Sequence, residues 1–530
     1  MGFDELRPGQ REAIESVLAG RDTLAVMSTG SGKSAIYQIA GLLIPGATVI
    51  VSPLIALQRD QVEALRDRAA GGAAQLNSSI GRAEREEALA ELAEDALEFL
   101  FLAPEQLGNP DVLGELAIAQ PSLLVVDEAH CISEWGHDFR PEYLRLGAAV
   151  EALGRPTVLA LTATAAPPVR EEIVERLGLR DPDLVVRGFD RPNLRLEAAG
   201  FFGDEGGRRR DRALLDAVAE APAPGILYVA TRRRAEDLAG ELERRGVRAG
   251  HYHGGMPAKA RTAVQEAFME DELDAVVATT AFGMGVDKPN VRWVFHAEPA
   301  DSLDSYFQEI GRAGRDGDPA LARIFYRPED VGLRRFFAGS GQVGIDELVQ
   351  VVGAVEAAPG PVEPTTLRET TELSESKLAT AVSRLEDAGA VEVLPGGEVV
   401  ETEDAPPPET ALEAAIEAEE RRRSFDRSRV EMMRGYAETD GCRRAFILSY
   451  FGEPFDPPCG NCDNCAAGRI GAAPAEDQPF AVGARVAHDS FGEGVLQRYD
   501  GESVVVLFDD VGYKSLALEL VAERGLLRAV

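Results

Sequence analysis

The sequence is short of lysine, and of positive charge in general. Its 530 residues hold 55 lysines and arginines against 90 aspartates and glutamates, which gives a formal net charge of −35. Five of these cations are lysines: Lys33, Lys259, Lys288, Lys377 and Lys514. Such a balance excludes a protein that binds nucleic acid or anionic membranes through its overall charge. Any nucleic-acid partner would need local basic patches, and we expect weak, salt-sensitive binding.

Three runs of consecutive arginines are the candidate patches, at residues 208–210, 232–234 and 421–423. Each run is either an ordinary solvated surface or a phosphate contact, and the sequence leaves both open.

Long hydrophobic runs are also missing. The longest, residues 42–57, is interrupted by Pro45, Gly46 and Pro53, so it indicates a buried strand and its loops. The N-terminal residues show no signal-peptide pattern. We therefore expect a cytoplasmic protein without a membrane partner.

Cysteine is scarce, and four of the five cysteines are clustered. Cys442, Cys459, Cys462 and Cys465 follow the spacing C-x16-C-x2-C-x2-C. Four thiolates at this spacing favour a structural Zn²⁺ site. An iron–sulfur cluster is an alternative, and disulfides are disfavoured in a reducing compartment. The fifth, Cys131, is predicted to be a packing residue rather than a reactive thiol.

A glycine-rich loop follows an apolar strand at residues 24–27. Its glycines let backbone N–H groups surround phosphate oxygens, and the following helix adds its partial positive charge. Lys33 would reach the β- and γ-phosphates, and Ser34 would hold Mg²⁺. Met27 stands where the common pattern has its first glycine, so an ordinary turn is the alternative. The nucleotide-binding residues predicted here are Thr29, Gly30, Ser31, Gly32, Lys33 and Ser34.

Two adjacent carboxylates, Asp127 and Glu128, end a second apolar strand at residues 123–126. In this position one carboxylate can hold Mg²⁺ while the other orients a water against a phosphate. An aromatic and cationic cluster follows directly, and such clusters stack on unpaired bases unless they are merely structural. Its members are Trp135, His137, Phe139 and Arg140. A hydrolysis site beside a base-contacting loop indicates a motor on nucleic acid.

Arg312 and Arg315 lie three residues apart in a stretch, 308–317, that we expect to be a helical turn. That spacing would put both guanidinium groups on one face. An arginine that reaches a γ-phosphate stabilises charge in the transition state. The alternative is a solvated basic helix end.

The order of these motifs resembles superfamily-two helicases, and specifically the RecQ family of DNA helicases. The similar segments are residues 3–10, 29–34, 52–57, 127–141, 161–165, 189–194, 278–291 and 308–317. The resemblance implies an ATP-, Mg²⁺- and Zn²⁺-dependent enzyme that moves 3′-to-5′ on single-stranded DNA. It would unwind forked duplex in repair and recombination, associated with the nucleoid.

The resemblance also implies residue roles. Phe3 would stack on adenine, Arg7 and Gln10 would bind the nucleotide, and Ser52 would contact DNA. Asp127 would coordinate Mg²⁺ and Glu128 would polarise the attacking water. Asp287 would contact the nucleotide sugar, with Arg315 as the arginine finger.

Five segments are expected along the α/β chain. Residues 1–190 and 191–335 alternate apolar strands with helices, which predicts two RecA-like parallel-sheet domains with nucleotide between them. Predicted strands include 48–51, 99–102, 123–126, 157–161, 225–229, 275–278 and 293–296. Residues 343–402 predict a winged-helix-like module with a hairpin at 391–400, in either a DNA-contact or a packing role.

The last third follows an acidic linker at 402–409. Residues 410–468 predict a helical, zinc-binding module, and residues 479–530 a small SH3-like β-barrel that would dock a protein partner or grip DNA. The functional alternatives are a DNA translocase or RNA helicase, and a non-hydrolysing, nucleotide-dependent DNA-binding scaffold.

Overall fold

The computed structural model describes residues 5–67, 71–94, 96–133, 140–203, 205–283, 286–330, 343–394, 397–402, 405–453, 455–469, 478–500 and 503–530. The chain divides into two compact units. The first comprises Met1–Met27, Ser31–Gly188 and Gly339–Arg423, and the second comprises Ser28–Gly30, Phe189–Ala338 and Ser424–Val530. None of the described helices has the length and apolar character needed to cross a bilayer.

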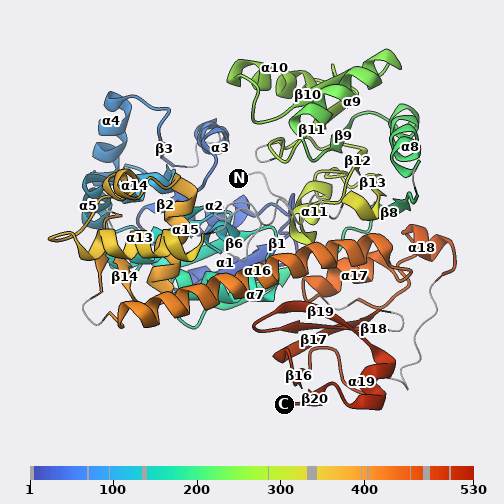
Figure 1. Cartoon of the computed structure of the whole chain (residues 1–530). Coiled ribbons are helices and arrows are strands. Elements are labelled where there is room, and N and C mark those ends of the chain that lie inside the picture. Colours follow the sequence, from blue (N-terminus) through green and yellow to red (C-terminus); the bar gives the residue numbers. More distant parts are fainter. Residues whose placement is uncertain are drawn as a thin grey trace. The chain divides into compact units, whose positions relative to one another are not determined.

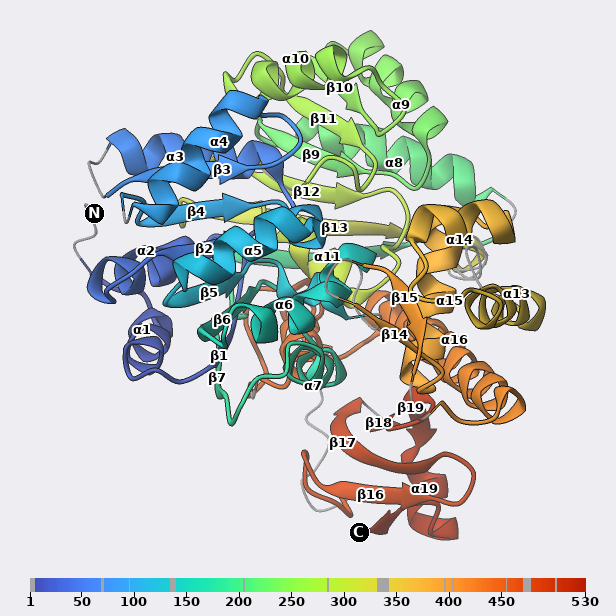
Figure 2. The same ribbon diagram turned by 90° about the vertical axis from the view of Figure 1, so that its left-hand side faces the viewer.

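A seven-stranded parallel sheet is the centre of the first unit, in the order β3-β4-β2-β5-β6-β1-β7 (blue to teal in Figure 1, with all its strands labelled in Figure 2). Its strands are β1 (Thr23–Met27), β2 (Thr48–Val51), β3 (Ala73–Leu76), β4 (Phe99–Leu102), β5 (Leu123–Val126), β6 (Thr157–Thr162) and β7 (Asp183–Arg187). Every residue of β1, β2, β4 and β5 is buried. Continuous apolar strands of this kind form where helices cover both faces of a parallel sheet.

In the described part of the first 190 residues, seven helices and three short 3₁₀ turns accompany these strands; α1 precedes β1, and the others connect successive strands. They are α1 (Gln10–Leu18), α2 (Ser34–Leu43), α3 (Ile55–Asp67), α4 (Arg82–Ala93), α5 (Pro110–Ala119), α6 (Leu146–Ala152), α7 (Pro167–Arg176), η1 (Pro104–Gly108), η2 (Ala129–Ile132) and η3 (Pro141–Arg145). Because the strands are parallel, the segments that follow β1, β2, β5 and β6 leave the sheet at one edge. The glycine-rich loop and the paired carboxylates both lie there.

A six-stranded parallel sheet, in the order β10-β11-β9-β12-β13-β8, is the centre of the second unit (Figure 1). Its elements are β8 (Leu194–Gly200), α8 (Gly206–Glu220), β9 (Gly225–Tyr228), α9 (Arg232–Arg244), β10 (Ala249–Tyr252), α10 (Ala258–Met269), β11 (Ala275–Ala278), β12 (Trp293–His296), α11 (Leu303–Ile310) and β13 (Ala320–Tyr326). A Cβ on Gly225 would lie 1.9 Å from Cε2 of Trp293, so only glycine fits beside this buried tryptophan.

Residues 343–402 form an inserted module that belongs to the first unit. It consists of α13 (Ile345–Glu356), α14 (Pro364–Thr371), α15 (Glu375–Asp387) and an antiparallel hairpin of β14 (Val391–Val393) and β15 (Val399–Glu401). The module has its own apolar core, to which all five elements contribute.

The C-terminal third begins with a 31-residue helix, α16 (Pro408–Glu438), followed by α17 (Arg443–Tyr450) and the short α18 (Asp463–Ala466). A five-stranded antiparallel sheet follows, in the order β19-β18-β17-β16-β20. It contains β16 (Arg485–His488), β17 (Gly492–Asp500), β18 (Ser503–Phe508), β19 (Gly512–Ala517), α19 (Leu518–Arg524) and β20 (Arg528–Ala529). Its buried side chains form a separate small core.

These elements confirm the two parallel sheets expected from the sequence and differ at some boundaries. Helix α16 begins at Pro408, inside the expected linker, because a proline is well tolerated in the first turn of a helix. Helix α11 ends at Ile310, so Arg312 and Arg315 lie in turns beyond it rather than on a helical turn. Gly314, with φ +60°, does not continue a helix.

Candidate functional site

The glycine-rich loop joins the end of β1 to the start of α2. Gly30 and Gly32 have φ values of +78° and +77°, in the left-handed region that glycine adopts without strain. Ser34 is the first residue of α2, so the loop is held at a helix N-terminus. The ammonium group of Lys33 donates to the carbonyl of Met27 at 3.1 Å.

Two hydroxyls of this loop fit a phosphate ligand. Among the described residues, Thr29 Oγ1 and Ser31 Oγ are buried and have no hydrogen-bond partner. A buried hydroxyl without a partner is costly, and a phosphate oxygen could accept from it. The loop is therefore consistent with the nucleotide site predicted from the sequence.

Gln10 braces the loop from α1. Its amide nitrogen donates to the carbonyls of Ser31 at 3.0 Å and Gly32 at 2.9 Å, and its side-chain oxygen accepts from the backbone N–H of Arg7. A Cβ on Gly32 would lie 2.8 Å from that amide nitrogen, so the glycine also permits this close approach. The sequence predicted Gln10 as a nucleotide contact and did not indicate the bracing role.

The paired carboxylates follow the central strand β5. Asp127 accepts from the backbone N–H of Glu128 at 3.0 Å and from the Ser52 hydroxyl at 3.4 Å. Burial, and then the charge of Glu128, raise the pKa of Asp127 to about 7, while the charge of Lys33 lowers it. A pair of adjacent carboxylates in which the charge of Glu128 raises the pKa of Asp127 fits a divalent cation such as Mg²⁺, whose charge would offset the repulsion.

Glu128 has φ 49° and ψ 46°, which places a non-glycine residue in the left-handed region. Its Oε2 is buried and has no hydrogen-bond partner in the described part of the chain, although it lies 3.4 Å from Nδ1 of His130. Strained conformations and unsatisfied polar atoms of this kind concentrate at functional sites.

Three polar side chains around the carboxylates were not found from the sequence. The Tyr143 hydroxyl donates to the carbonyl of Asp127 at 2.9 Å. His130 Nδ1 lies 2.9 Å from Oγ1 of Thr162, which joins the ends of β5 and β6. These partners come from different segments, so only the adjacency of two parallel strand ends could have suggested them.

Ser52 directly follows β2 and is 2% exposed. Its hydroxyl is directed at Asp127, and its carbonyl accepts from Gln58 at 2.7 Å. The contact between Ser52 and DNA stays a prediction. Phe3, Trp135, His137 and Phe139 lie outside the described residues.

Arg312 and Arg315 lie together in the second unit. Arg312 is 5% exposed and donates to the carbonyl of Gly283, and its Nε has no hydrogen-bond partner among the described residues. Arg315 donates to the Asp287 carboxylate at 2.5 Å and to the carbonyl of Val286 at 3.3 Å. Burial, and then the charge of Arg312, lower the pKa of Arg315. A buried and a largely buried guanidinium group whose positive charges interact fit an anionic ligand.

The four clustered cysteines converge on one point. All four Sγ atoms lie within 4.8 Å of one another, with Cys459–Cys465 at 3.6 Å and Cys442–Cys465 at 3.7 Å. Four sulfurs about 2.3 Å from a tetrahedral Zn²⁺ would be roughly 3.8 Å apart. The arrangement fits a structural zinc ion, which these cysteines would hold. Cys131 is separate and fully buried.

A second group of potential ligands consists of Glu236, His251 and His253. His253 Nε2 lies 3.0 Å from the Glu236 carboxylate, and the side chain of Glu236 is 54% exposed. This group offers three ligands, one of them exposed, which is a less complete set than the four cysteines.

Comparisons with known proteins agree with this geometry. The DEAD/DEAH box helicase family matches residues 7–173, the helicase conserved C-terminal domain matches 210–317, and the RecQ zinc-binding family matches 403–466. The chain is 36% identical over 468 residues to the probable ATP-dependent DNA helicase RecS of Bacillus subtilis, covering 88% of this chain and 89% of that protein.

The chain belongs to the RecQ family of DNA helicases. It is also 34% identical to the ATP-dependent DNA helicase RecQ of Bacillus subtilis, over 88% of this chain but 65% of that longer protein. A crystal structure of the DUF1998 helicase MrfA bound to DNA and AMPPNP has a similar fold. It has a TM-score of 0.54 and 18% identity, and the match covers 77% of this chain and 61% of that one.

The three arginine runs, the candidate DNA contacts of this helicase, have fewer arginines available for DNA phosphates than their sequence suggests. The third arginine of each run is held by a carboxylate of its own unit. Arg210 pairs with Asp330 at 2.6 Å, Arg234 with Asp211 at 2.6 Å, and Arg423 with Glu419 at 3.2 Å.

Proposed function

We propose that this protein is an ATP- and Mg²⁺-dependent DNA helicase that moves 3′-to-5′ on a single strand and unwinds forked duplex during repair and recombination. Membership of the RecQ family supports the activity and the direction. The observation that carries the proposal is the half-buried Asp127 directly after β5, with Glu128 beside it and the charge of Lys33 acting on it.

The proposed chemistry divides among these side chains. The loop N–H groups, Lys33 and the hydroxyls of Thr29 and Ser31 would bind the phosphates of ATP. Ser34 and Asp127 would hold Mg²⁺, which supplies charge stabilisation to the phosphoryl oxygens. Glu128 would orient the attacking water.

Further roles come from the family resemblance. Phe3, Arg7 and Gln10 would hold the base, and Asp287 would contact the sugar. Arg312 and Arg315 would stabilise charge on the γ-phosphate, with Arg315 as the finger. We also propose the DNA contacts predicted from the sequence, at Ser52, Trp135, His137, Phe139 and Arg140.

The remaining segments have proposed roles as well. The cysteine cluster would hold Zn²⁺ in a rigid module at 410–468. The helices and hairpin at 343–402 support a winged-helix-like module, and the five-stranded antiparallel sheet at 479–530 supports an SH3-like barrel that docks a protein partner. Residues 1–190 and 191–335 would be the two RecA-like domains. We place the enzyme on the nucleoid.

A lysine substitution tests the activity. Lys33→Ala should abolish ATP hydrolysis and leave single-stranded DNA binding intact, because Lys33 acts on phosphates. Lys259→Ala, at an exposed position on α10, is the matched control and should retain wild-type turnover. Turnover is measured with and without single-stranded DNA, and strand displacement is measured on forked DNA and forked RNA.

DNA-stimulated hydrolysis that survives in Lys33→Ala would reject the assignment. Hydrolysis that DNA stimulates without strand displacement would indicate a DNA translocase. Displacement of strands from forked RNA alone would indicate an RNA helicase. DNA binding without any ATP turnover would indicate a scaffold.

A further inference from the structure

Three potential metal ligands meet at one edge of the second sheet, away from the cysteines in sequence. Helix α9 packs against β10, the edge strand, and carries Glu236 in its second turn (Figure 1). His251 lies in β10, and His253 directly follows this strand. Because side chains alternate along a strand, the two histidines share one face of it. Both elements belong to the second unit.

The geometry of the three side chains fits one shared ion. Each offers a ligand atom, and these atoms lie within 4.8 Å of one another. His253 Nε2 lies 3.0 Å from the Glu236 carboxylate, and the rings of His251 and His253 are stacked with centroids 5.7 Å apart. Ligands about 2.1 Å from a tetrahedral Zn²⁺ would be roughly 3.4 Å apart. Small side-chain shifts would reach that geometry, and the side chain of Glu236, 54% exposed, has the freedom to make them.

The buried member, His253, is incompletely satisfied by protein atoms. Its backbone N–H donates to Met256 Sδ at 3.3 Å and its carbonyl accepts from the Met256 N–H at 3.1 Å, which fixes the turn that carries the ring. The residue is 5% exposed, yet Nδ1 has no hydrogen-bond partner among the described residues. A histidine that served packing alone would normally have both ring nitrogens hydrogen-bonded. The unsatisfied ring therefore supports a role as a ligand.

The carboxylate of Glu236 is not neutralised by the arginine run that precedes it. Arg232, one helical turn earlier, lies against Gly255, where an added Cβ would be 2.9 Å from its Nη1. The other two arginines of the run pair with Asp237 at 3.7 Å and with Asp211 at 2.6 Å. In the described part of the chain, Glu236 pairs with His253 and with no arginine or lysine. Its negative charge is thus available to a cation.

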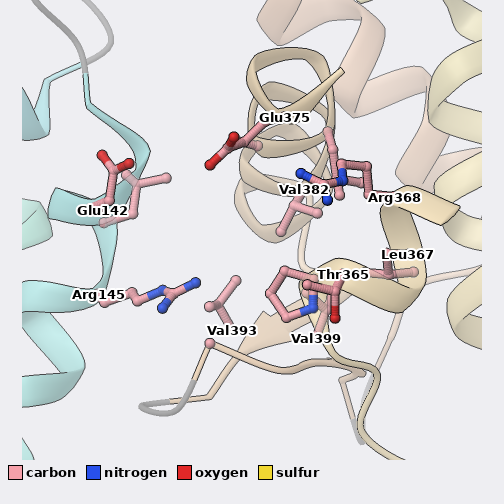
Figure 3. A pocket seen from close by; sticks show the side chains of 14 residues that line it. Glu142, Arg145, Thr365, Leu367, Arg368, Glu375, Val382, Val393 and Val399 are labelled. Carbon is pink, nitrogen blue, oxygen red and sulfur yellow. The ribbon is translucent and has the colours of Figure 1, made fainter. Parts of the chain in front are cut away.

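The carboxylates around a cavity of about 200 Å³ in the first unit have the opposite surroundings. Figure 3 shows Glu142 and Arg145 on one side of this cavity, with Arg368 and Glu375 on the other. Two guanidinium groups line the same space as the two carboxylates, so their charge opposes a further cation. Glu375 is exposed and serves as a matched carboxylate that should bind no metal.

We propose that Glu236, His251 and His253 form an exchangeable site for a late transition-metal dication such as Zn²⁺. Two imidazoles and a carboxylate suit these ions, whereas Mg²⁺ prefers oxygen ligands alone. Three protein ligands leave one coordination position open to water, and the exposed Glu236 lets the ion exchange with solvent. The site is additional to the zinc of the cysteine cluster and independent of the proposed helicase activity.

The test titrates the full-length protein, which retains zinc on its cysteines, with Zn²⁺ by calorimetry in a buffer that contains Mg²⁺. The wild-type protein should bind one further ion saturably. His251→Ala and Glu236→Gln should each weaken this binding roughly tenfold or more, because even a residue that only orients a metal ligand contributes that much. Glu375→Gln should bind Zn²⁺ as the wild-type protein does.

Titration with Co²⁺ distinguishes the two metal sites. Co²⁺ on two imidazoles and a carboxylate should absorb without the sulfur-to-metal charge-transfer bands that cysteine ligands produce, and His251→Ala should lose this spectrum. Thermal unfolding without added metal checks the fold, and the exposed Glu236→Gln keeps the test decisive if His251→Ala lowers the unfolding temperature. A wild-type protein without a further saturable site, a cobalt spectrum with sulfur bands alone, or Glu236→Gln and His251→Ala variants that bind Zn²⁺ normally would overturn the inference.

Discussion

At the scale of single residues, Glu128 combines several unfavourable features. Its left-handed backbone costs a non-glycine residue about 1–2 kcal/mol. One of its carboxylate oxygens is buried without a hydrogen bond to any residue that the structure describes, and its charge raises the pKa of the neighbouring Asp127. A residue chosen for stability would have none of these features, so they support a catalytic role.

Replacing Glu128 with Gln should therefore separate stability from activity. Glu128→Gln removes the repulsion of Asp127, so the Tm of the Mg²⁺-free protein should rise. Turnover of ATP should fall on the order of a hundredfold or more, because the base that orients water is lost. Calorimetry and a steady-state ATPase assay measure the two effects, with exposed Glu105→Gln as the control. A variant with wild-type turnover would contradict the role given to Glu128.

The sequence predicted some site residues and not others for a physical reason. Phosphate binding and zinc binding need several ligands, many of them close together in the chain, so local spacing predicts residues 29–34 and the four cysteines. The bracing by Gln10 and the contact between Ser133 and Glu172 join residues far apart in sequence. Such contacts are determined by the tertiary fold and leave no local pattern.

At the scale of elements, the cysteine cluster covers the edge of the second sheet. Strand β8 is an edge strand, and Leu196 forms a parallel bridge with Cys462. Ala198 N–H donates to the Asp463 carboxylate at 3.0 Å, and Arg444 donates to the carbonyl of Leu194 at 2.9 Å. An uncovered edge strand would be open to pairing with another chain. A zinc ion would therefore also protect the sheet.

Loss of zinc should consequently be detected along β8. Removal by a chelator, or the Cys462→Ser substitution, forfeits zinc-binding free energy of about 10 kcal/mol or more. Amide exchange of Leu194–Gly200 should accelerate, and the protein should tend to aggregate. Strand β10, at the opposite edge of the same sheet, is the internal control and should stay protected. Unchanged exchange in β8, after metal analysis confirms that zinc is gone, would contradict this prediction.

Strands could be predicted from the sequence where every residue of the strand is buried. Four-residue apolar runs such as Phe99–Leu102 and Ala275–Ala278 were placed at their observed bounds, because a strand buried on both faces has no polar position. The short α19 and β20 were not predicted. Strand β20 has two residues, both exposed, so no burial pattern marks it.

At the scale of the whole molecule, a DNA enzyme with a net charge of −35 must limit its phosphate contacts. The structure restricts them further, because Arg210, Arg234 and Arg423 are engaged by carboxylates of their own units. These three arginines are therefore less available to DNA, and the net negative charge opposes long-range attraction to the phosphate backbone.

Affinity for single-stranded DNA should accordingly be weak and fall steeply with salt. Contacts to about three to five phosphates, each contributing roughly −0.7 to the slope of log K against log salt, predict a loss of roughly 20- to 100-fold between about 50 and about 200 mM. Fluorescence anisotropy of a labelled oligonucleotide over this range measures the slope, and basal ATP turnover in the same buffers shows whether the protein itself is affected. An affinity that does not change with salt would mean that stacking on bases, rather than phosphate contact, holds the strand. An affinity that falls much more steeply with salt would mean that the arginine runs exchange their carboxylate partners for phosphates.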